Sequence, residues 1–227
     1  MFANRTLAAM DADDLASLLP YLTERRVDRD SVLSQQGEKI RDVYFPTTAR
    51  LRNTVTFLDG RAAETFIIGS EGVSGLSPFL ADTPSGWSVE VAITGAAYHL
   101  PAKVLRDRIK VSPTLLNQFV RLLNDYLTQA AQGIACASLH HATARLARFL
   151  LVASERIETK ELRLTQQDLA LALAVQRTTV NASAAELKKS KAISYSRGVI
   201  TIRDLPKLEA FACECYKLQQ SILAAAA

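Results

Sequence analysis

Arginine, threonine and asparagine gather in the first turns of a short amphipathic segment, residues 176–189. Arg177, Thr178 and Asn181 fall on a different face from the apolar residues, which recur at spacings of four and three. An arginine guanidinium can form two hydrogen bonds with guanine, and asparagine or threonine can bond base edges or phosphates. These residue types indicate that one helix face reads duplex DNA.

A second helical segment, immediately upstream, would hold this face in place. Thr165 and Asp168 have the spacing of a capping box, in which the hydroxyl and the carboxylate satisfy free N–H groups of the first turn. Ala170 is small at the point where the second helix must cross closely. Two such helices joined by a tight break form a helix-turn-helix, whose second helix enters the major groove.

A two-stranded hairpin is predicted after these helices. Ile193–Ser196 and Val199–Ile202 alternate around Arg197-Gly198, which gives a wing with a basic tip. The alternative interpretation is a small helical subdomain whose polar face is solvated or binds another protein. We predict that DNA is contacted by Thr165, Gln167, Gln176, Arg177, Thr178, Thr179, Asn181, Lys188 and Arg197.

Charge is unevenly distributed along the chain. Residues 1–139 contain 14 Lys/Arg and 15 Asp/Glu, a net charge of −1. Residues 140–227 contain 13 Lys/Arg and 8 Asp/Glu, a net charge of +5. A basic C-terminal part beside a nearly neutral N-terminal part favours phosphate contact by the C-terminal module alone.

The composition is that of a folded globular chain of one or two domains, with 48% apolar and 22% charged residues among 227. No apolar run is long enough to span a membrane, and early acidic residues argue against a secretory signal. Three cysteines, an odd and small number, fit a reducing cytoplasm, which is the expected location.

Residues 25–100 predict a β-domain. Short alternating runs are separated by turn residues, such as the Asp59-Gly60 pair between Leu51–Leu58 and Glu64–Ile68. Several strands at this spacing indicate a small sandwich or barrel of the jelly-roll kind. Such a domain can enclose a ligand or act as a rigid spacer.

The densest glycine cluster, residues 69–75, lies inside this β-domain. Glycines let backbone N–H groups cradle an anion, although they also satisfy ordinary tight turns. Between Ala62 and Ala102 there is no lysine or arginine, and a buried phosphate without a paired cation is costly. We therefore expect an uncharged effector or none, in a pocket lined by Gly72, Val73, Ser74, Gly75, Leu76, Ser85 and Trp87.

A long helix is predicted from Pro113, with Ser112 as its N-cap. Apolar residues recur at alternating spacings of four and three through three heptads, the pattern of a coiled coil. The alternative is an ordinary amphipathic helix packed on its own domain. This heptad stripe, the predicted homodimer interface, consists of Leu116, Val120, Leu123, Leu127, Ala130, Ile134 and Ala137.

The order of parts, from β-domain and glycine loop to long helix, helix-turn-helix and wing, resembles the Crp/Fnr family of bacterial transcription regulators. The resemblance covers nearly the whole chain and is carried by YFPTTARLRNTVTFLDGRAAETFIIGSEGVSGL, RLARFLL, LTQQDLALALAVQRTTV and SRGVITIRD. It is closest to a subgroup with an IGxEGxxGL loop and a C-terminal CECY, present as Cys213–Tyr216.

The resemblance implies an α+β fold: a cyclic-nucleotide-binding-like jelly-roll over residues 1–111, a dimerisation helix over 112–139 and a winged helix-turn-helix over 140–227. It implies a homodimer on a palindromic promoter site with half-sites about one helical turn apart, and RNA polymerase as a partner. The alternatives are a scaffold whose helix-turn-helix binds protein, and a DNA binder that needs no effector.

Several positions depart from the family pattern in the reading helix. Arg177 matches a common family arginine, but Thr178 stands where glutamate is usual and Ala182 where a second arginine often lies. The usual half-site should therefore not be assumed, and Thr179 and Asn181 are expected to share the reading. Ala174 replaces a glycine frequent in the turn, at a cost of up to about 1 kcal/mol if its φ is positive.

The β-domain departs further. The family positions for a ribose-binding glutamate and a phosphate-binding arginine correspond to Val73 and the Pro84–Gly86 stretch, which disfavours a cyclic nucleotide. Members that sense oxygen through an iron–sulfur cluster need four cysteines, most of them near the N-terminus. This chain has none before Cys136, so that cluster is not expected.

We expect no catalytic activity, no cofactor and no metal, because none of the common catalytic or metal-binding motifs occurs. His99, His140 and His141 could ligate haem, but isolated histidines are more often structural. Cys213 and Cys215 are too close for a C-x-x-C site and would lie about 200° apart on a final helix opened by Pro206. Packing is their expected role, with a redox or metal role as the alternative.

Overall fold

The computed structural model describes residues 2–157 and 159–218. Its contacts divide the chain into two compact units, residues 1–130 and 131–227, each with its own hydrophobic core. The boundary falls within one continuous helix, α5 (Pro113–Leu139). Among the described residues, no helix combines the length and apolar character that crossing a membrane requires.

The N-terminal unit begins with three short helical pieces. They are α1 (Arg5–Ala8), α2 (Ala12–Leu18) and the 3-10 turn η1 (Leu19–Tyr21). Asn4 accepts a hydrogen bond from the Leu7 N–H, and Asp11 accepts one from the Asp13 N–H. Each side chain therefore starts a new helix, and the chain turns between the two caps.

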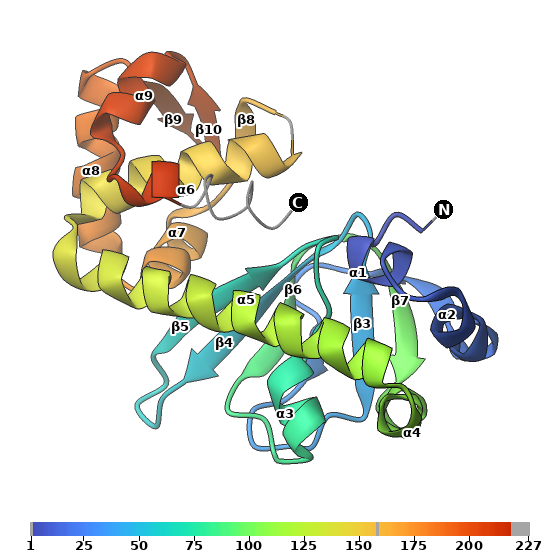
Figure 1. The fold of residues 1–227 in the computed structure, drawn as a ribbon. Helices are drawn as coiled ribbons and strands as arrows, with labels where there is room; N and C mark the ends of the chain where they lie inside the picture. The colour runs from blue at the N-terminus through green and yellow to red at the C-terminus, as the bar shows by residue number, and fades with distance from the viewer. Residues whose placement is uncertain (1, 158, 219–227) are drawn as a thin grey trace. The chain divides into compact units, whose positions relative to one another are not determined.

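Seven strands of this unit form a β-sandwich of two antiparallel sheets, with strand orders β1-β7-β3 and β2-β6-β4-β5 (Figure 1). Buried side chains from both sheets, among them Val27, Leu51 and Val91, share one apolar cluster. The Asp59-Gly60 pair lies in the β4–β5 hairpin, and Gly60 adopts a φ of +80°. The strands are β1 (Thr23–Val27), β2 (Val32–Ser34), β3 (Asp42–Pro46), β4 (Arg50–Thr56), β5 (Ala62–Ile68), β6 (Ser88–Ile93) and β7 (Gly95–Pro101).

Helix α5 is anchored to the N-terminal unit at its first turn. The helices α3 (Leu76–Ala81) and α4 (Ala102–Val111) precede it. Ser112 caps α5, since its Oγ accepts a hydrogen bond from the Leu115 N–H at 3.1 Å, and the same hydroxyl donates to the Asp14 carboxylate at 2.7 Å. Asp14 is buried and also pairs with the Arg108 Nε at 2.6 Å. The predicted N-cap is confirmed, and it connects α5 to α2 and α4.

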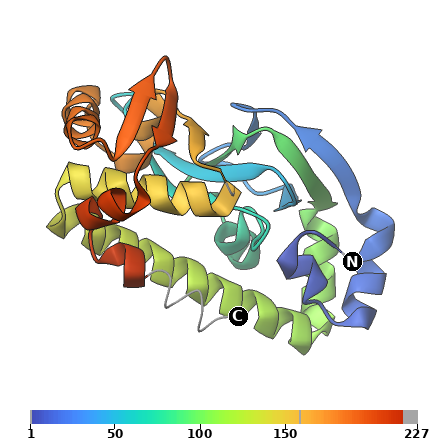
Figure 2. The same cartoon turned by 90° about the horizontal axis from the view of Figure 1, so that it is seen from above.

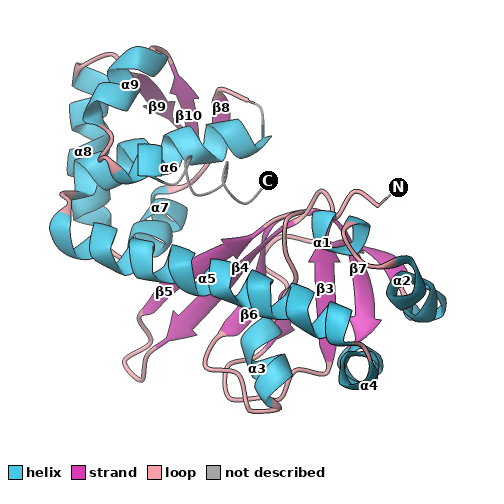
Figure 3. Cartoon of the chain, viewed as in Figure 1, coloured by secondary structure: helices cyan, strands magenta, loops and turns pink. Residues whose placement is uncertain are grey.

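The C-terminal unit is a helical module with a small three-stranded sheet, ordered β8-β10-β9 (Figure 3). Its core joins Leu146 and Leu150 of α6 to Leu169 of α7, Val180 of α8 and Ile200 of the sheet. The elements are α6 (Ala142–Ile157), β8 (Glu161–Arg163), α7 (Gln166–Leu173), α8 (Arg177–Lys189), β9 (Ile193–Ser196), β10 (Val199–Ile202) and α9 (Leu205–Phe211).

The expectation that Cys213 and Cys215 lie on opposite sides of a final helix is wrong. Helix α9 ends at Phe211, and the backbone of Ala212 is extended, with φ −68° and ψ 145°. The two cysteines therefore follow α9: Cys213 lies in non-helical backbone, and Cys215 begins a separate helical stretch, residues 215–218.

We predict that Ala174→Gly stabilises the protein. Ala174 closes α7 in the left-handed region, with φ 50° and ψ 48°, where a β-carbon is strained by about 1 kcal/mol. Glycine removes that strain, so the midpoint of chemical denaturation of the full chain, followed by circular dichroism, should rise.

The matched control is Ala185→Gly, at an exposed position inside α8 with ordinary helical backbone. This change should lower the free energy of unfolding by about 0.5–1 kcal/mol. Equal destabilisation by the two glycines would contradict the strain assigned to Ala174.

Candidate DNA-binding surface and β-domain interior

The helix pair α7–α8 begins as the sequence predicts. The Thr165 Oγ1 accepts a hydrogen bond from the Asp168 N–H at 3.1 Å, and the Asp168 carboxylate accepts one from the Thr165 N–H at 2.8 Å. This reciprocal pair is a complete capping box. Ala170 is 9% exposed in the core shared with α8, so a small residue does lie at the crossing.

Helix α8 has a buried face and an exposed face, and the buried face sets the rotation of the helix about its axis. Val180, Ala184 and Leu187 are buried, as their spacing predicts. The opposite face is formed by polar residues and by two exposed alanines, Ala182 and Ala185. Small side chains on an exposed helix face allow a partner surface to approach the backbone closely.

The predicted DNA-contacting residues lie on the surface of the C-terminal unit, mostly on α8 and the loops beside it. Thr179 alone among them is half-buried. Gln176 is the N-cap residue of α8, and its side chain makes no capping hydrogen bond. The exposed residues of the predicted set are Thr165, Gln167, Gln176, Arg177, Thr178, Asn181, Lys188 and Arg197.

The Arg177 side chain is hydrogen-bonded to Gln167, a contact that the sequence does not predict. Its Nε donates a hydrogen bond to the Gln167 Oε1 at 2.5 Å. Gln167 lies in the first turn of α7, so the bond joins the N-terminal turns of both helices. The guanidinium is thereby oriented before any ligand arrives, and its Nη groups are not used in this bond.

The wing is a β-hairpin with a two-residue turn, because Ser196 pairs with Val199 across that turn. Arg197 and Gly198 adopt φ values of +49° and +76°, as a type I′ turn requires. The hairpin protrudes from the C-terminal unit (Figure 2). The Lys188 Nζ donates to the Tyr195 carbonyl at 3.2 Å, so α8 and the wing are tied together at the base of the hairpin.

The elements that carry this surface also carry exposed positive charge. Two carboxylates lie on the same helices: Asp168 caps α7, and Glu186 accepts a hydrogen bond from Thr143 at 2.7 Å. The exposed basic residues of β8, α8 and the wing are Arg163, Arg177, Lys188, Lys189, Lys191 and Arg197.

The glycine loop of the β-domain uses its backbone groups internally. The Gly69 N–H donates to the Glu71 carboxylate, and the Ser74 N–H donates to the Tyr44 carbonyl. The Val73 N–H donates to the Tyr126 Oη at 2.9 Å, while the same hydroxyl donates to the Val73 carbonyl at 3.0 Å. These three N–H groups therefore already have hydrogen-bond partners within the protein.

Close packing explains one glycine of this loop. A β-carbon on Gly72 would lie 2.2 Å from the Tyr126 hydroxyl, so only glycine lets α5 approach. Tyr126 comes from α5 and its phenol is buried, which raises its pKa above the ordinary value. The sequence gives no signal for this contact, because a tyrosine in an amphipathic helix looks like any core residue.

The predicted pocket residues do not form one cluster. Val73 and Leu76 are buried in the core that includes α5, whereas Trp87 packs in the separate cluster between the sheets. The Ser74 Oγ accepts a hydrogen bond from the Tyr44 N–H, and the Ser85 Oγ donates to the Trp87 carbonyl at 2.6 Å. The loop residues therefore act as structural connections, and Trp87 marks the interior of the sandwich.

Polar atoms without a hydrogen-bond partner among the described residues line that interior. They are the Ser34 Oγ, the Asn53 Oδ1 and the Trp87 Nε1. Ser34 and Asn53 both pair with Val89, and Trp87 lies two residues before that valine, so all three share its face of the sheet. Arg52 lies on the other face of the same sheet, where its guanidinium pairs with Glu90 at 2.9 Å and with Asp30 at 3.2 Å.

Helix α5 carries two apolar faces. Leu115 and Phe119 are buried in the core of the N-terminal unit, and Leu123 packs partly against the same core. The heptad stripe otherwise lies largely in the open, with Leu127 at 68% and Ile134 at 70% exposure. The amphipathic interpretation is thus correct for one face, and a second apolar face remains uncovered within the single chain.

The isolated histidine of the β-domain is structural. The His99 Nε2 lies 2.9 Å from the Asp42 carboxylate, and its Nδ1 lies 3.3 Å from the Thr23 hydroxyl. Both ring nitrogens thus face neighbours on adjacent strands. His141 is exposed, whereas His140 contacts the thiol of Cys215.

Residues 144–211 match the sequence model of the Crp-like helix-turn-helix domain. No curated protein sequence matches the chain. The C-terminal module is thus a Crp-like helix-turn-helix, as its spacing and the resemblance both predicted.

Solved structures share the fold across both units. A protein from Eubacterium rectale, described as a transcriptional regulator of the Crp/Fnr family, superposes with a TM-score of 0.78 at 18% identity, over 90% of this chain and 95% of that one. FixK2 of Bradyrhizobium japonicum gives 0.73 at 19% identity, over 85% and 98%. The c-di-GMP-responsive global regulator CLP of Xanthomonas campestris gives 0.73 at 15%, over 85% and 99%. These similarities confirm the predicted α+β fold class.

We predict that Tyr126→Phe destabilises the N-terminal unit. The change removes one hydroxyl that bonds both the N–H and the carbonyl of Val73, and leaves buried backbone groups without that partner. The expected loss is about 1–3 kcal/mol in the free energy of unfolding, measured by urea denaturation.

Tyr21→Phe is the matched control, because Tyr21 is 52% exposed. Its effect should stay within about 0.5 kcal/mol. A Tyr126→Phe protein as stable as the control would show that the loop does not depend on this contact.

Proposed function

We propose that this chain is a Crp/Fnr-type transcription regulator that binds DNA as a homodimer and is not an enzyme. The observation that carries the proposal is the Crp-like helix-turn-helix, in which α8 presents Arg177, Thr178 and Asn181 beside a basic wing. The net charge of +5 over residues 140–227 supports contact with phosphates. The IGxEGxxGL and CECY motifs favour one subgroup of that family.

The reading helix would enter the major groove with its first turns foremost. Arg177 could form two hydrogen bonds with a guanine, through the Nη groups that its bond to Gln167 leaves unused. Asn181 and Thr178 would contact further base edges. The exposed alanines at 182 and 185 would permit close approach and apolar contact with thymine methyl groups.

Dimerisation would proceed along the heptad stripe. On α5, exposed leucine, valine and isoleucine side chains recur at alternating spacings of four and three. A two-stranded coiled coil buries side chains with this spacing. A symmetric dimer presents two copies of α8, which a palindromic site matches. RNA polymerase is the protein partner that such a promoter-bound regulator implies.

An effector of the β-domain would be uncharged and polar. The interior carries unpartnered oxygen and nitrogen atoms, the loop's N–H groups are used, and Arg52 is paired with acids. The Tyr126 contact between the glycine loop and α5 is the route by which a change in the β-domain would reach that helix. The alternative is constitutive DNA binding, and titration of uncharged candidates against operator affinity would distinguish the two.

The decisive experiment is selection of bound fragments from genomic DNA by the purified full-length protein. A palindrome with half-sites about one helical turn apart would support the proposal. Recovery of no enriched sequence would favour the competing interpretation, in which the helix-turn-helix binds another protein.

We predict that Arg177→Ala lowers affinity for the selected site by about 1–3 kcal/mol and relaxes the preference at one base position of each half-site. Lys207→Ala is the control that removes an equal charge, from an α9 residue paired with Asp204. Affinities are measured by fluorescence anisotropy at several salt concentrations.

Gln167→Ala adds a test of positioning. Because Gln167 orients Arg177, the losses of binding free energy caused by Gln167→Ala and Arg177→Ala should be less than additive in a double-mutant cycle. If Arg177→Ala and Lys207→Ala weaken all sequences equally, Arg177 does not read a base.

We predict that the double substitution Leu127→Glu and Ile134→Glu separates the dimer into monomers. Each substitution would place two like charges opposite one another across the two-fold axis. Sedimentation velocity should detect the change. Leu58→Glu, at a fully exposed residue of the β4–β5 hairpin, is the control and should remain dimeric. Affinity for the palindrome should fall in the variant, and affinity for a single half-site should not. A variant that still sediments as a dimer would place the interface elsewhere.

A further inference from the structure

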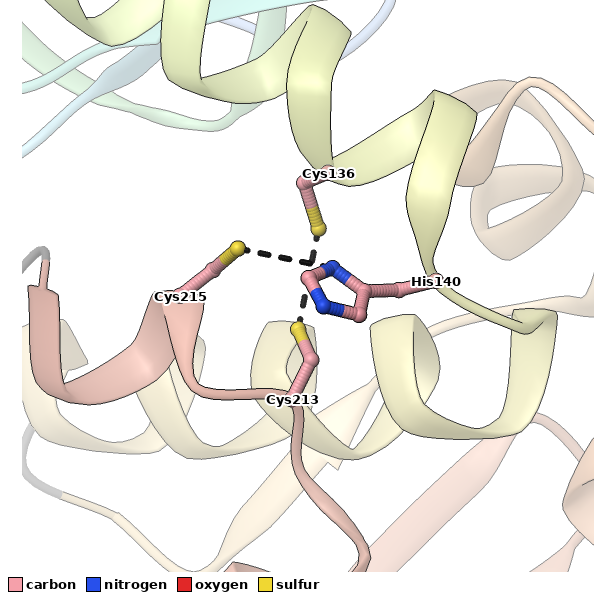
Figure 4. A group of neighbouring side chains, drawn as sticks. All are labelled: Cys136, His140, Cys213 and Cys215. Carbon is pink, nitrogen blue, oxygen red and sulfur yellow. Dashed lines mark hydrogen bonds between the residues drawn. The ribbon is translucent and has the colours of Figure 1, made fainter.

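Four potential metal ligands converge in the C-terminal unit, in a place that the proposed function does not use. Cys136, His140, Cys213 and Cys215 each offer one ligand atom, and these atoms all lie within 4.8 Å of one another. Figure 4 shows the three thiols directed towards the His140 imidazole. Cys136 lies in the last turns of α5, and the other two cysteines follow α9.

The spacing of the four residues along the chain explains the convergence. Cys136 and His140 are four residues apart, so both side chains leave the end of α5 on one side. Cys213 and Cys215 flank one residue in the segment after α9, where the backbone is no longer helical at Ala212. A thiol–imidazole pair at the end of α5 therefore meets the two thiols of the segment that follows α9.

We propose that these four residues bind a single zinc ion, as a closed Cys3His site. Three thiolates and one imidazole form a common ligand set of structural zinc. The imidazole would ligate through Nδ1, the nitrogen that lies 3.5 Å from the Cys215 Sγ. Binding by three neutral thiols and a neutral imidazole would release three protons, which balances the charge of the reaction.

The distances fit one ion. With zinc–sulfur bonds of about 2.3 Å, neighbouring sulfurs of a tetrahedral site lie about 3.8 Å apart. The Cys136 and Cys213 sulfurs are 3.6 Å apart, and no ligand-atom pair of the group exceeds 4.8 Å. A four-iron cluster binds one thiolate at each of four separate corners and needs a wider ligand cage than this.

The surroundings suit thiolate ligands. All three cysteines are buried, which keeps the site closed to water. The Gln132 Nε2 donates a hydrogen bond to the Cys215 Sγ at 3.0 Å, the kind of outer contact that orients a metal ligand. Three thiolates and one Zn²⁺ carry a net charge of −1, and the positive Arg148 guanidinium is close enough to act on Cys136 and Cys213.

A disulfide is the competing use of these cysteines. The 3.6 Å between the Cys136 and Cys213 sulfurs is too long for a bond of about 2.05 Å. A disulfide would also leave Cys215 and His140 without a common purpose, whereas one ion uses all four residues.

An ion at this position would join the end of α5 to the segment that follows α9. These parts are 77 residues apart in sequence at Cys136 and Cys213. Such an ion would stabilise the folded unit, chiefly because the four ligands come together only in the folded state and the ion binds that state alone. The inference does not depend on DNA binding, since it concerns the stability of the unit itself.

The test begins with the full-length protein, purified with reducing agent and without added metal. We expect about one zinc per chain by elemental analysis, released by a thiol-blocking mercurial and not by brief exposure to a weak chelator. Cobalt exchanged into the site should give the intense visible absorption of tetrahedral thiolate coordination. Removal of zinc by a strong chelator should lower the thermal unfolding midpoint, and restoring zinc should reverse the loss.

His140→Ala and His141→Ala form a matched pair, since the two histidines are adjacent and only His140 belongs to the group. His140→Ala should lose zinc or alter the cobalt spectrum, and His141→Ala should retain both. Cys213→Ser should lose the ion, with circular dichroism to check that the chain remains folded. The native protein's own zinc content keeps the test valid if a variant misfolds.

Three results would overturn the proposal. One is a reduced, folded protein that carries and takes up no stoichiometric zinc. Another is a mass two hydrogens lower with a Cys136–Cys213 linkage in the protein isolated under reducing conditions, which would mean a disulfide. The last is iron with acid-labile sulfide, which would mean a cluster in place of a single ion.

Discussion

The packing of α5 is the constraint on which the rest of this protein depends, because one helix must serve two apolar faces. Leu115 and Phe119 are buried in the core of the N-terminal unit, and the capped first turn is held by the Ser112–Asp14 contact. This fixes which way the helix is rotated about its axis. Apart from Leu123, which packs partly against that core, the heptad stripe then faces away from it, where a second copy of the helix can cover it.

The same helix accounts for the contacts of the glycine loop. Tyr126 occupies both the N–H and the carbonyl of Val73, and Gly72 makes room for its hydroxyl. A loop that in principle could present its amides to an anion is instead a contact between β-domain and helix. Its glycines serve close approach, and the interior of the sandwich, around Trp87, is left with uncharged polar groups.

In the C-terminal unit, short-range contacts position helix α8, and a tertiary contact orients its Arg177 side chain. The capping box sets the start of α7, and the buried side of α8 sets its rotation. The bond between Gln167 and Arg177 then orders a guanidinium that would otherwise sample many rotamers. The cysteine–histidine group lies where the chain after α9 returns to the end of α5.

The sequence alone determined the features that rest on short-range spacing. These are the Thr165–Asp168 cap, the buried positions of α8, the Arg197-Gly198 turn, and the division of the chain into strands and helices. Each involves residues only a few positions apart, whose geometry follows from the helix or strand period. Only the tertiary structure decided what meets across long loops, as with Tyr126 and Val73 or Cys136 and Cys213. The end of α9 at Phe211 shows why, since moving one helix end by a few residues turns two cysteines from opposite sides of a helix towards one point. No local pattern fixes that boundary, because it is set by packing against residues far away in the chain.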